Sequence, residues 1–83
     1  MPYIKPEERI VMDGVVDFLK IAGVEPNGKL NYILYAFCKR NIEPSYNNYK
    51  NYLGELEECV AEIRRRILSK YEDEAIARNG DVD

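Results

Sequence analysis

The strongest pattern in the chain is an apolar repeat in its C-terminal half. Leu53, Leu56, Val60, Ile63 and Ile67 follow one another at alternating steps of three and four residues. This spacing is typical of an apolar stripe on an α-helix that meets a second helix along a seam. The sequence therefore predicts a long amphipathic helix, and it makes these five residues the candidate interaction seam.

Local signals place the ends of this helix at Ser45, a favourable N-cap, and at Asn79-Gly80, a typical helix end. Ser69-Lys-Tyr-Glu72 also has the form of a capping box, so a restart at Ser69 is an open alternative. An unbroken helix would be about 50 Å long, more than the rest of so short a chain can easily cover. We expect the seam to meet a second copy of the protein; packing against the two earlier helices is the alternative.

Two shorter helices are predicted before it. The first begins at Pro6 and ends at Gly23, although Asp13 could cap a helix that restarts beside Gly14. The second covers about residues 29–40, and Asn41 is placed to take a left-handed closing conformation. Its apolar stripe consists of Leu30, Ile33, Leu34, Phe37 and Cys38.

No stretch alternates apolar and polar residues as a strand would. The predicted fold class is therefore all-α: a small helical bundle of three main helices, with a long C-terminal amphipathic helix, forming a dimer. We expect a single helical domain over residues 1–83, in which 1–5 is an extended arm and 80–83 a frayed tail.

The composition agrees with a folded domain, because 46% of the 83 residues are hydrophobic and 33% are charged. A domain of this size buries only about 60 to 65% of its unfolded surface, so oligomerisation would help its stability. No apolar run reaches the roughly 20 residues that cross a bilayer, and no signal peptide is apparent. We expect no membrane association, a cytoplasmic location, and buried free thiols at Cys38 and Cys59.

The net charge of −3 argues against a nucleic-acid partner, because binding to phosphates needs a concentrated basic surface. The one basic run is Arg64-Arg65-Arg66, and Glu62 can pair with Arg66 one helical turn away. We expect a solvated, largely neutralised face here. The alternative is an anion contact made by two arginine triplets in a dimer.

Most catalytic chemistries lack their residues in this sequence. There is no histidine, two cysteines cannot complete a four-ligand zinc site, and neither Ser45 nor Ser69 has a base at a recognisable spacing. No glycine-rich loop has the form that binds phosphate. We expect no catalytic residue and no cofactor.

Three carboxylates that share a helical face, Glu55, Glu58 and Glu62, form the one alternative with a metal, because such a face can hold Mg²⁺. The segment Leu53-Gly-Glu-Leu-Glu-Glu58 resembles part of the first motif of the helical nucleoside triphosphate pyrophosphohydrolases. That resemblance implies a metal-dependent nucleotide pyrophosphohydrolase-like protein. The family's second motif, glutamate followed three residues later by aspartate, is missing. The other interpretation of these glutamates is a solvated flank of the seam.

Tyrosines mark the start of the long helix. Tyr46, Tyr49 and Tyr52 advance in steps of three, and tyrosine suits protein interfaces because it combines apolar area with a polar tip. With Arg64 and Arg65 they form a candidate surface for a partner or ligand. The alternative is packing between the second and third helices.

Motifs at both ends and in the middle carry a wider resemblance: Met1-Pro-Tyr-Ile-Lys-Pro-Glu-Glu-Arg9, Leu30-Asn-Tyr32, Tyr71-Glu-Asp73 and Asn79-Gly-Asp-Val82. Over nearly the whole length the chain resembles a small family of uncharacterised prokaryotic and phage proteins. The resemblance implies a helical protein of this size and no particular activity. The leading hypothesis is a homodimeric binding or interaction module, which could also bind another protein.

Overall fold

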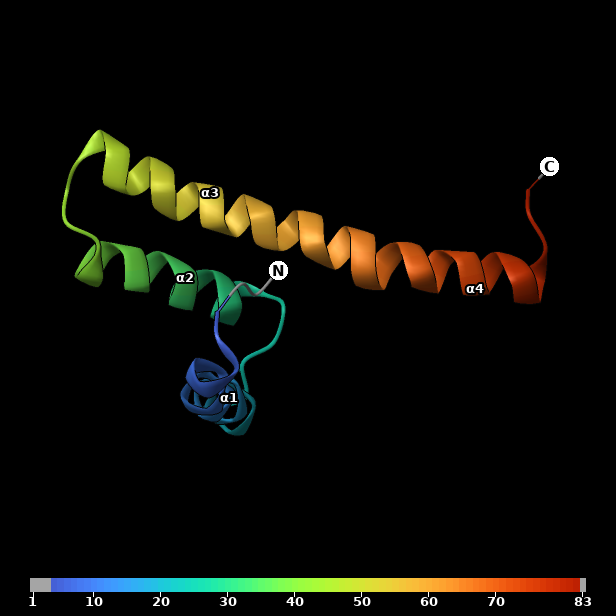
Figure 1. Ribbon diagram of the computed structural model, residues 1–83, viewed down its shortest axis with the longest axis horizontal. Helices are drawn as coiled ribbons and strands as arrows, with labels where there is room; N and C mark the ends of the chain where they lie inside the picture. The colour runs from blue at the N-terminus through green and yellow to red at the C-terminus, as the bar shows by residue number, and fades with distance from the viewer. Residues whose placement is uncertain (1–3, 83) are drawn as a thin grey trace.

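The computed structural model describes residues 4–82, and these fold into helices joined by short turns (Figure 1). In chain order the elements are α1 (Pro6–Ile21), α2 (Gly28–Asn41), α3 (Tyr46–Ile63), the π-helical turn η1 (Arg64–Leu68) and α4 (Ser69–Asn79). The described part of the chain contains no strand. The predicted all-α class with a long C-terminal helix is confirmed.

The long helix consists of α3, η1 and α4, which follow one another without a break (Figure 1). It begins as predicted at Ser45, whose hydroxyl oxygen accepts a hydrogen bond from the backbone N–H of Asn48 at 3.0 Å. Ser69 has helical dihedral angles, φ −61° and ψ −40°, and α4 has no side-chain cap. The alternative of a restart at Ser69 is therefore wrong: the helix passes through this residue.

The turn η1 changes the direction in which later side chains point. Here the backbone N–H of Ser69 donates to the carbonyl of Arg64, five residues earlier. A π-turn holds more residues than an α-turn, so the residues after it are rotated relative to a regular α-helix. Leu68 is therefore rotated toward the side of Arg64, four residues earlier, and it is 42% exposed, whereas Ile67 is 65% exposed.

The helix α1 begins at Pro6 as expected, but it continues through Asp13 and Gly14 without interruption. The alternative of a helix restarting at Asp13 is wrong. After α1, Gly23 adopts φ +77°, the left-handed conformation that glycine accommodates most readily.

The helix α2 is capped by Asn27, whose side-chain oxygen accepts from the N–H of Lys29 at 2.8 Å. Asn41 is its last residue and is not left-handed, because within residues 4–82 only Gly23 and Gly80 have positive φ. Instead, the Asn41 side-chain amide donates to the carbonyl of Phe37 at 3.2 Å. The chain then leaves the helix through Ile42 in an extended conformation.

The two shorter helices do not cover the second half of the long one (Figure 1). α2 runs beside the first half of the long helix, and α1 is seen nearly end-on beneath α2. α4 extends away from them, with no other helix beside it. The longest dimension of the molecule, 50 Å, is therefore that of the long helix itself.

The single chain has apolar faces but no interior, because no residue between 4 and 82 is buried. Its accessible surface is 7677 Å², whereas a compact monomer of this mass exposes about 5,100 Å². Its radius of gyration is 16.5 Å, against about 12 Å for a compact domain of this length. The most protected apolar residues are only half-buried; they include Leu19, Val24, Ile33, Leu34, Ile42 and Leu56.

Two further expectations concern the ends and the membrane. Most of the predicted arm and the last residue of the predicted tail lie outside the described residues, but Lys5 is extended, with φ −66° and ψ 150°. Within the described residues, no helix combines the length and the apolar character needed to span a bilayer.

The two serines of the long helix provide a matched test of its boundaries. We expect Ser45→Ala to lower the free energy of unfolding by about 1 kcal/mol, because the cap of α3 is lost. Ser69→Ala should leave it unchanged or raise it slightly, because alanine is the better residue inside a helix. Urea unfolding followed by circular dichroism, at equal protein concentrations, measures both values. Equal losses in the two variants would contradict a continuous helix.

Candidate interaction surface

The contact between α2 and α3 centres on Tyr52. Its hydroxyl donates to the carbonyl of Leu34 at 2.6 Å, and its ring stacks on that of Phe37 with centroids 6.1 Å apart and planes inclined by 16°. Partial burial, with a smaller effect of Cys38, raises the pKa of the Tyr52 hydroxyl. The hydroxyl therefore remains protonated and able to donate at neutral pH. Tyr52 fixes α2 along one edge of the long helix.

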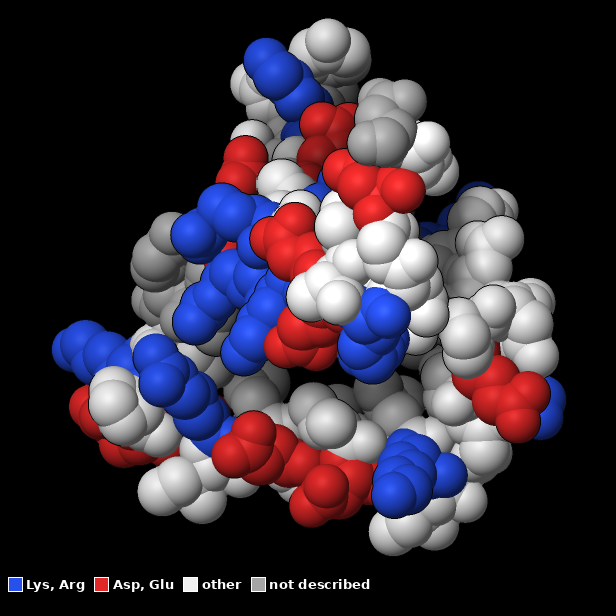
Figure 2. Space-filling model, turned by 90° about the vertical axis from the view of Figure 1, so that its right-hand side faces the viewer, with Lys and Arg blue, Asp and Glu red and all other residues white. Residues whose placement is uncertain are grey.

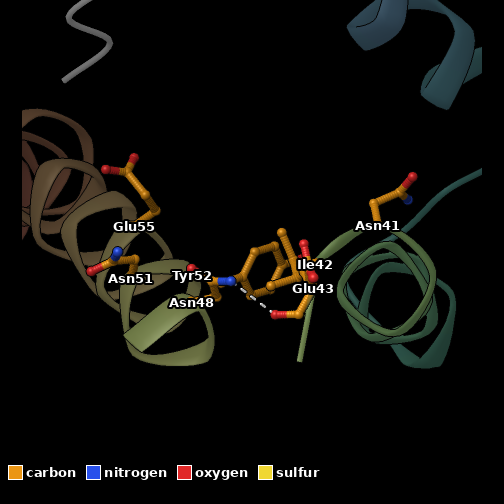
Figure 3. Close-up of a pocket in the computed structure, with 7 residues that line it drawn as sticks. All are labelled: Asn41, Ile42, Glu43, Asn48, Asn51, Tyr52 and Glu55. Atoms are coloured by element: carbon orange, nitrogen blue, oxygen red, sulfur yellow. Dashed lines mark hydrogen bonds between the residues drawn. The ribbon is translucent and has the colours of Figure 1, made fainter. Parts of the chain in front are cut away.

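An open pocket of about 400 Å³ lies at the turn between these helices (Figure 3). The side-chain amide of Asn48 spans the turn and donates to the carbonyl of Glu43 at 3.0 Å. Tyr52 and Ile42 lie close together between the helices, whereas Glu55 projects from α3 at the rim (Figure 3). The residues that line it are Asn41, Ile42, Glu43, Asn48, Asn51, Tyr52 and Glu55. The hydrogen bond across it holds the α2–α3 turn.

The predicted seam is mostly open to solvent. Leu56 is half-buried, while the other four seam residues, Leu53, Val60, Ile63 and Ile67, are exposed. Tyr52 holds α2 at one edge of the stripe, and Leu53 and Val60 lie further round the helix, with 55% and 51% of their surface exposed. The alternative in which the two earlier helices cover the whole seam does not occur in the single chain.

The predicted tyrosine and arginine surface is not brought together within one chain. Tyr52 faces α2, as the packing alternative expects, whereas Tyr46, Tyr49, Arg64 and Arg65 are exposed. Tyr46 and Arg64 lie about 27 Å apart along the helix axis. A ligand that touches both would have to follow the helix for five turns.

The basic run is partly neutralised by its own helix. Arg65 pairs with Glu62 at 3.0 Å, and Arg66 approaches the same carboxylate at 3.8 Å, which confirms the predicted Glu62–Arg66 pair. The hydrogen bond from Arg65 lowers the pKa of Glu62. Seen from the α4 end, positive and negative side chains are interspersed, and a hollow opens near the middle of this face (Figure 2).

The carboxylates of the metal alternative do not form a cluster. Glu55 and Glu58 are exposed, and Glu62 is engaged by two arginines. Among residues 4–82, no three or more Asp, Glu, Cys or His side chains are grouped so as to hold a metal ion. Both cysteines are free as expected, but only Cys38 is half-buried; Cys59 is exposed, so its predicted burial is wrong for the single chain.

Two residues on the exposed side of the predicted seam were not singled out from the sequence. Glu57 follows Leu53 by four residues and precedes Val60 by three, so it lies on the same face. Leu68 joins that face through the turn η1. The opposite charges of Glu57 and Arg64, seven residues apart, could have singled out Glu57. No local sequence pattern predicts the π-turn that places Leu68.

Comparison with known protein families gives a match over nearly the whole chain. The model of a protein family described as "Domain of unknown function (DUF6899)" matches residues 1–82. No curated protein and no solved structure matches the chain.

The Tyr52 contact can be tested by removing one oxygen atom. Tyr52→Phe leaves the Leu34 carbonyl without this donor, so we expect a loss of about 1 kcal/mol in the free energy of unfolding. Tyr46→Phe is the matched control, because Tyr46 is 80% exposed, and its unfolding should be unchanged. Urea unfolding at fixed protein concentration measures the difference. If both variants behave like the parent, the hydroxyl does not fix α2.

Proposed function

The chain belongs to the DUF6899 family, and we propose that it is a homo-oligomeric interaction module whose long helix binds a second copy of the same protein. The observation that carries this proposal is the absence of any buried residue in the described chain, although it has amphipathic helices.

The extent of uncovered surface supports an obligate association. The chain exposes 7677 Å², roughly 2,500 Å² more than a compact monomer of its mass. Two chains together carry an excess of roughly 5,000 Å², which lies at the upper end of the roughly 2,000 to 5,000 Å² that obligate homodimers bury in total. Exposed apolar patches much larger than about 600 Å² are rare on stable monomers.

The balance between conformational entropy and apolar burial also favours association. Ordering a residue costs about 1–2 kcal/mol of backbone entropy, and burial of apolar surface is the main contribution that offsets this cost. A chain whose best-protected apolar side chains are half-buried gains little from burial within itself. Under this proposal, folding and association are one process, and helix content depends on protein concentration.

A charge at the centre of the seam tests the proposal. Val60→Glu would place two carboxylates near each other in a desolvated interface. We therefore expect the dimer dissociation constant to rise more than about 100-fold. Val82→Glu is the matched control, because Val82 lies beyond α4 and is 98% exposed. Sedimentation equilibrium at micromolar concentration gives the mass, and circular dichroism gives the helix content.

We expect the parent chain and Val82→Glu to be dimeric and helical, while Val60→Glu loses mass and helix content together. A parent chain that remains a helical monomer at these concentrations would rule out the proposal. If Val60→Glu remains an unchanged dimer, the chain self-associates through a surface other than the seam.

A further inference from the structure

We propose that two copies pair through their long helices in antiparallel orientation, with Glu57 of each copy beside Arg64 of the other. This inference rests on the proposed self-association and adds the orientation and the register of the two chains.

The surface concerned is one face of the long helix, called here the open face. Leu53, Glu57, Val60 and Arg64 succeed one another at steps of four, three and four residues, so they lie above one another along the helix. The π-turn then brings Leu68 toward the same side. All five residues are exposed in the single chain.

The order of side chains along the open face is self-complementary. It has leucine at both ends, valine near the centre, a carboxylate on one side of the centre and a guanidinium on the other. Reversing the helix about a point between Val60 and Ala61 places Leu53 opposite Leu68 and Glu57 opposite Arg64. Glu57 then meets the opposite charge, the two leucines meet each other, and the two copies of Val60 lie on either side of the axis.

The symmetry of an antiparallel pair also brings the correct edges together. In an antiparallel pair, the two-fold axis is perpendicular to both helices. The rotation about this axis keeps each edge of the apolar stripe on the same side of the pair, so the same edge of each helix faces that of the other. Glu57 and Arg64 each follow a seam residue, Leu56 and Ile63, by one position and therefore share a flank. A parallel pair in register would bring the two acidic segments together and the two basic segments together.

The position of α2 leaves this face accessible. Tyr52 holds α2 at the other edge of the stripe, and α4 projects with no helix beside it (Figure 1). Antiparallel pairing lays the first half of each long helix against the second half of the other. Each uncovered α4 thereby gains a neighbour.

Disulfide cross-linking reads the orientation directly. In chains with Cys38→Ala and Cys59→Ser, a Leu53→Cys variant is mixed with a Leu68→Cys variant and oxidised. Antiparallel pairing brings cysteines 53 and 68 together, whereas two copies of cysteine 53 would lie about 22 Å apart, beyond the roughly 7 Å span of a disulfide. We expect covalent dimers in the mixture and none in either variant alone.

Charge reversal tests the register. These variants keep Cys38 and Cys59 and change only exposed residues. Glu57→Arg alone and Arg64→Glu alone should each raise the dimer dissociation constant about tenfold, since two ion pairs per dimer become repulsive. Mixing the two variants should restore the parent value within about threefold. Glu58→Arg carries the same change of net charge on a neighbouring face and should have little effect.

These outcomes separate the inference from the proposal on which it rests. Covalent dimers from Leu53→Cys alone indicate a parallel pair, and a dimeric mass with no cross-link and no charge rescue indicates another interface; either result overturns the antiparallel arrangement while self-association stands. A monomeric parent chain overturns both. Cross-linking in the mixture together with charge rescue supports both.

Discussion

The constraint on which the structure depends is the length of its last helix. Segments of 18, 5 and 11 residues join into one rod, and the two remaining helices are 16 and 14 residues long. A single short helix, α2, lies along the rod, and it reaches only the first half (Figure 1). A helix is stabilised in a protein mainly by packing of its apolar face rather than by its own hydrogen bonds. Within the described residues, no helix packs along the second half of this rod (Figure 1), which is the basis for the proposed second copy.

The apolar stripe of the long helix has two edges with different tasks. One edge carries Tyr52, which holds α2 by a hydrogen bond and a ring contact, and this edge organises the single chain. The other edge carries Glu57 and Arg64 and is open. Under the proposed arrangement the leucines and Val60 supply affinity, because apolar burial has no direction. The charges supply orientation, because reversing one helix exchanges attraction for repulsion.

The sequence predicted the fold well where one local signal acts alone. Pro6, Gly23 and Ser45 mark element ends by backbone geometry or by a single hydrogen bond, and each is found where expected. It misled where a local signal competes with an element already in progress. The capping box at Ser69 and the Asp13-Gly14 pair are restart signals inside apolar stripes, and continuing a helix is easier than starting one.

The candidate surface was predictable in part for a similar reason. Apolar spacing located the seam, but a π-turn depends on a balance between neighbouring backbone hydrogen bonds that side-chain periodicity does not encode. Leu68 was therefore not placed with the seam residues. Tyr46, Tyr49 and Tyr52 could not be divided between partner and core from spacing alone, because that division depends on which edge α2 takes.

Self-association through such a face has a consequence for what else can bind there. A competing helix would need apolar residues at matching spacing and, read antiparallel to this chain, a base opposite Glu57 and an acid opposite Arg64. A second copy of the chain meets that requirement by its own sequence order. A helix with only the apolar pattern would bury the leucines and Val60 but leave both charges unpaired at the rim, which lowers its affinity. In the proposed arrangement, the charge order thus favours a second copy of the chain over helices that share only the apolar stripe.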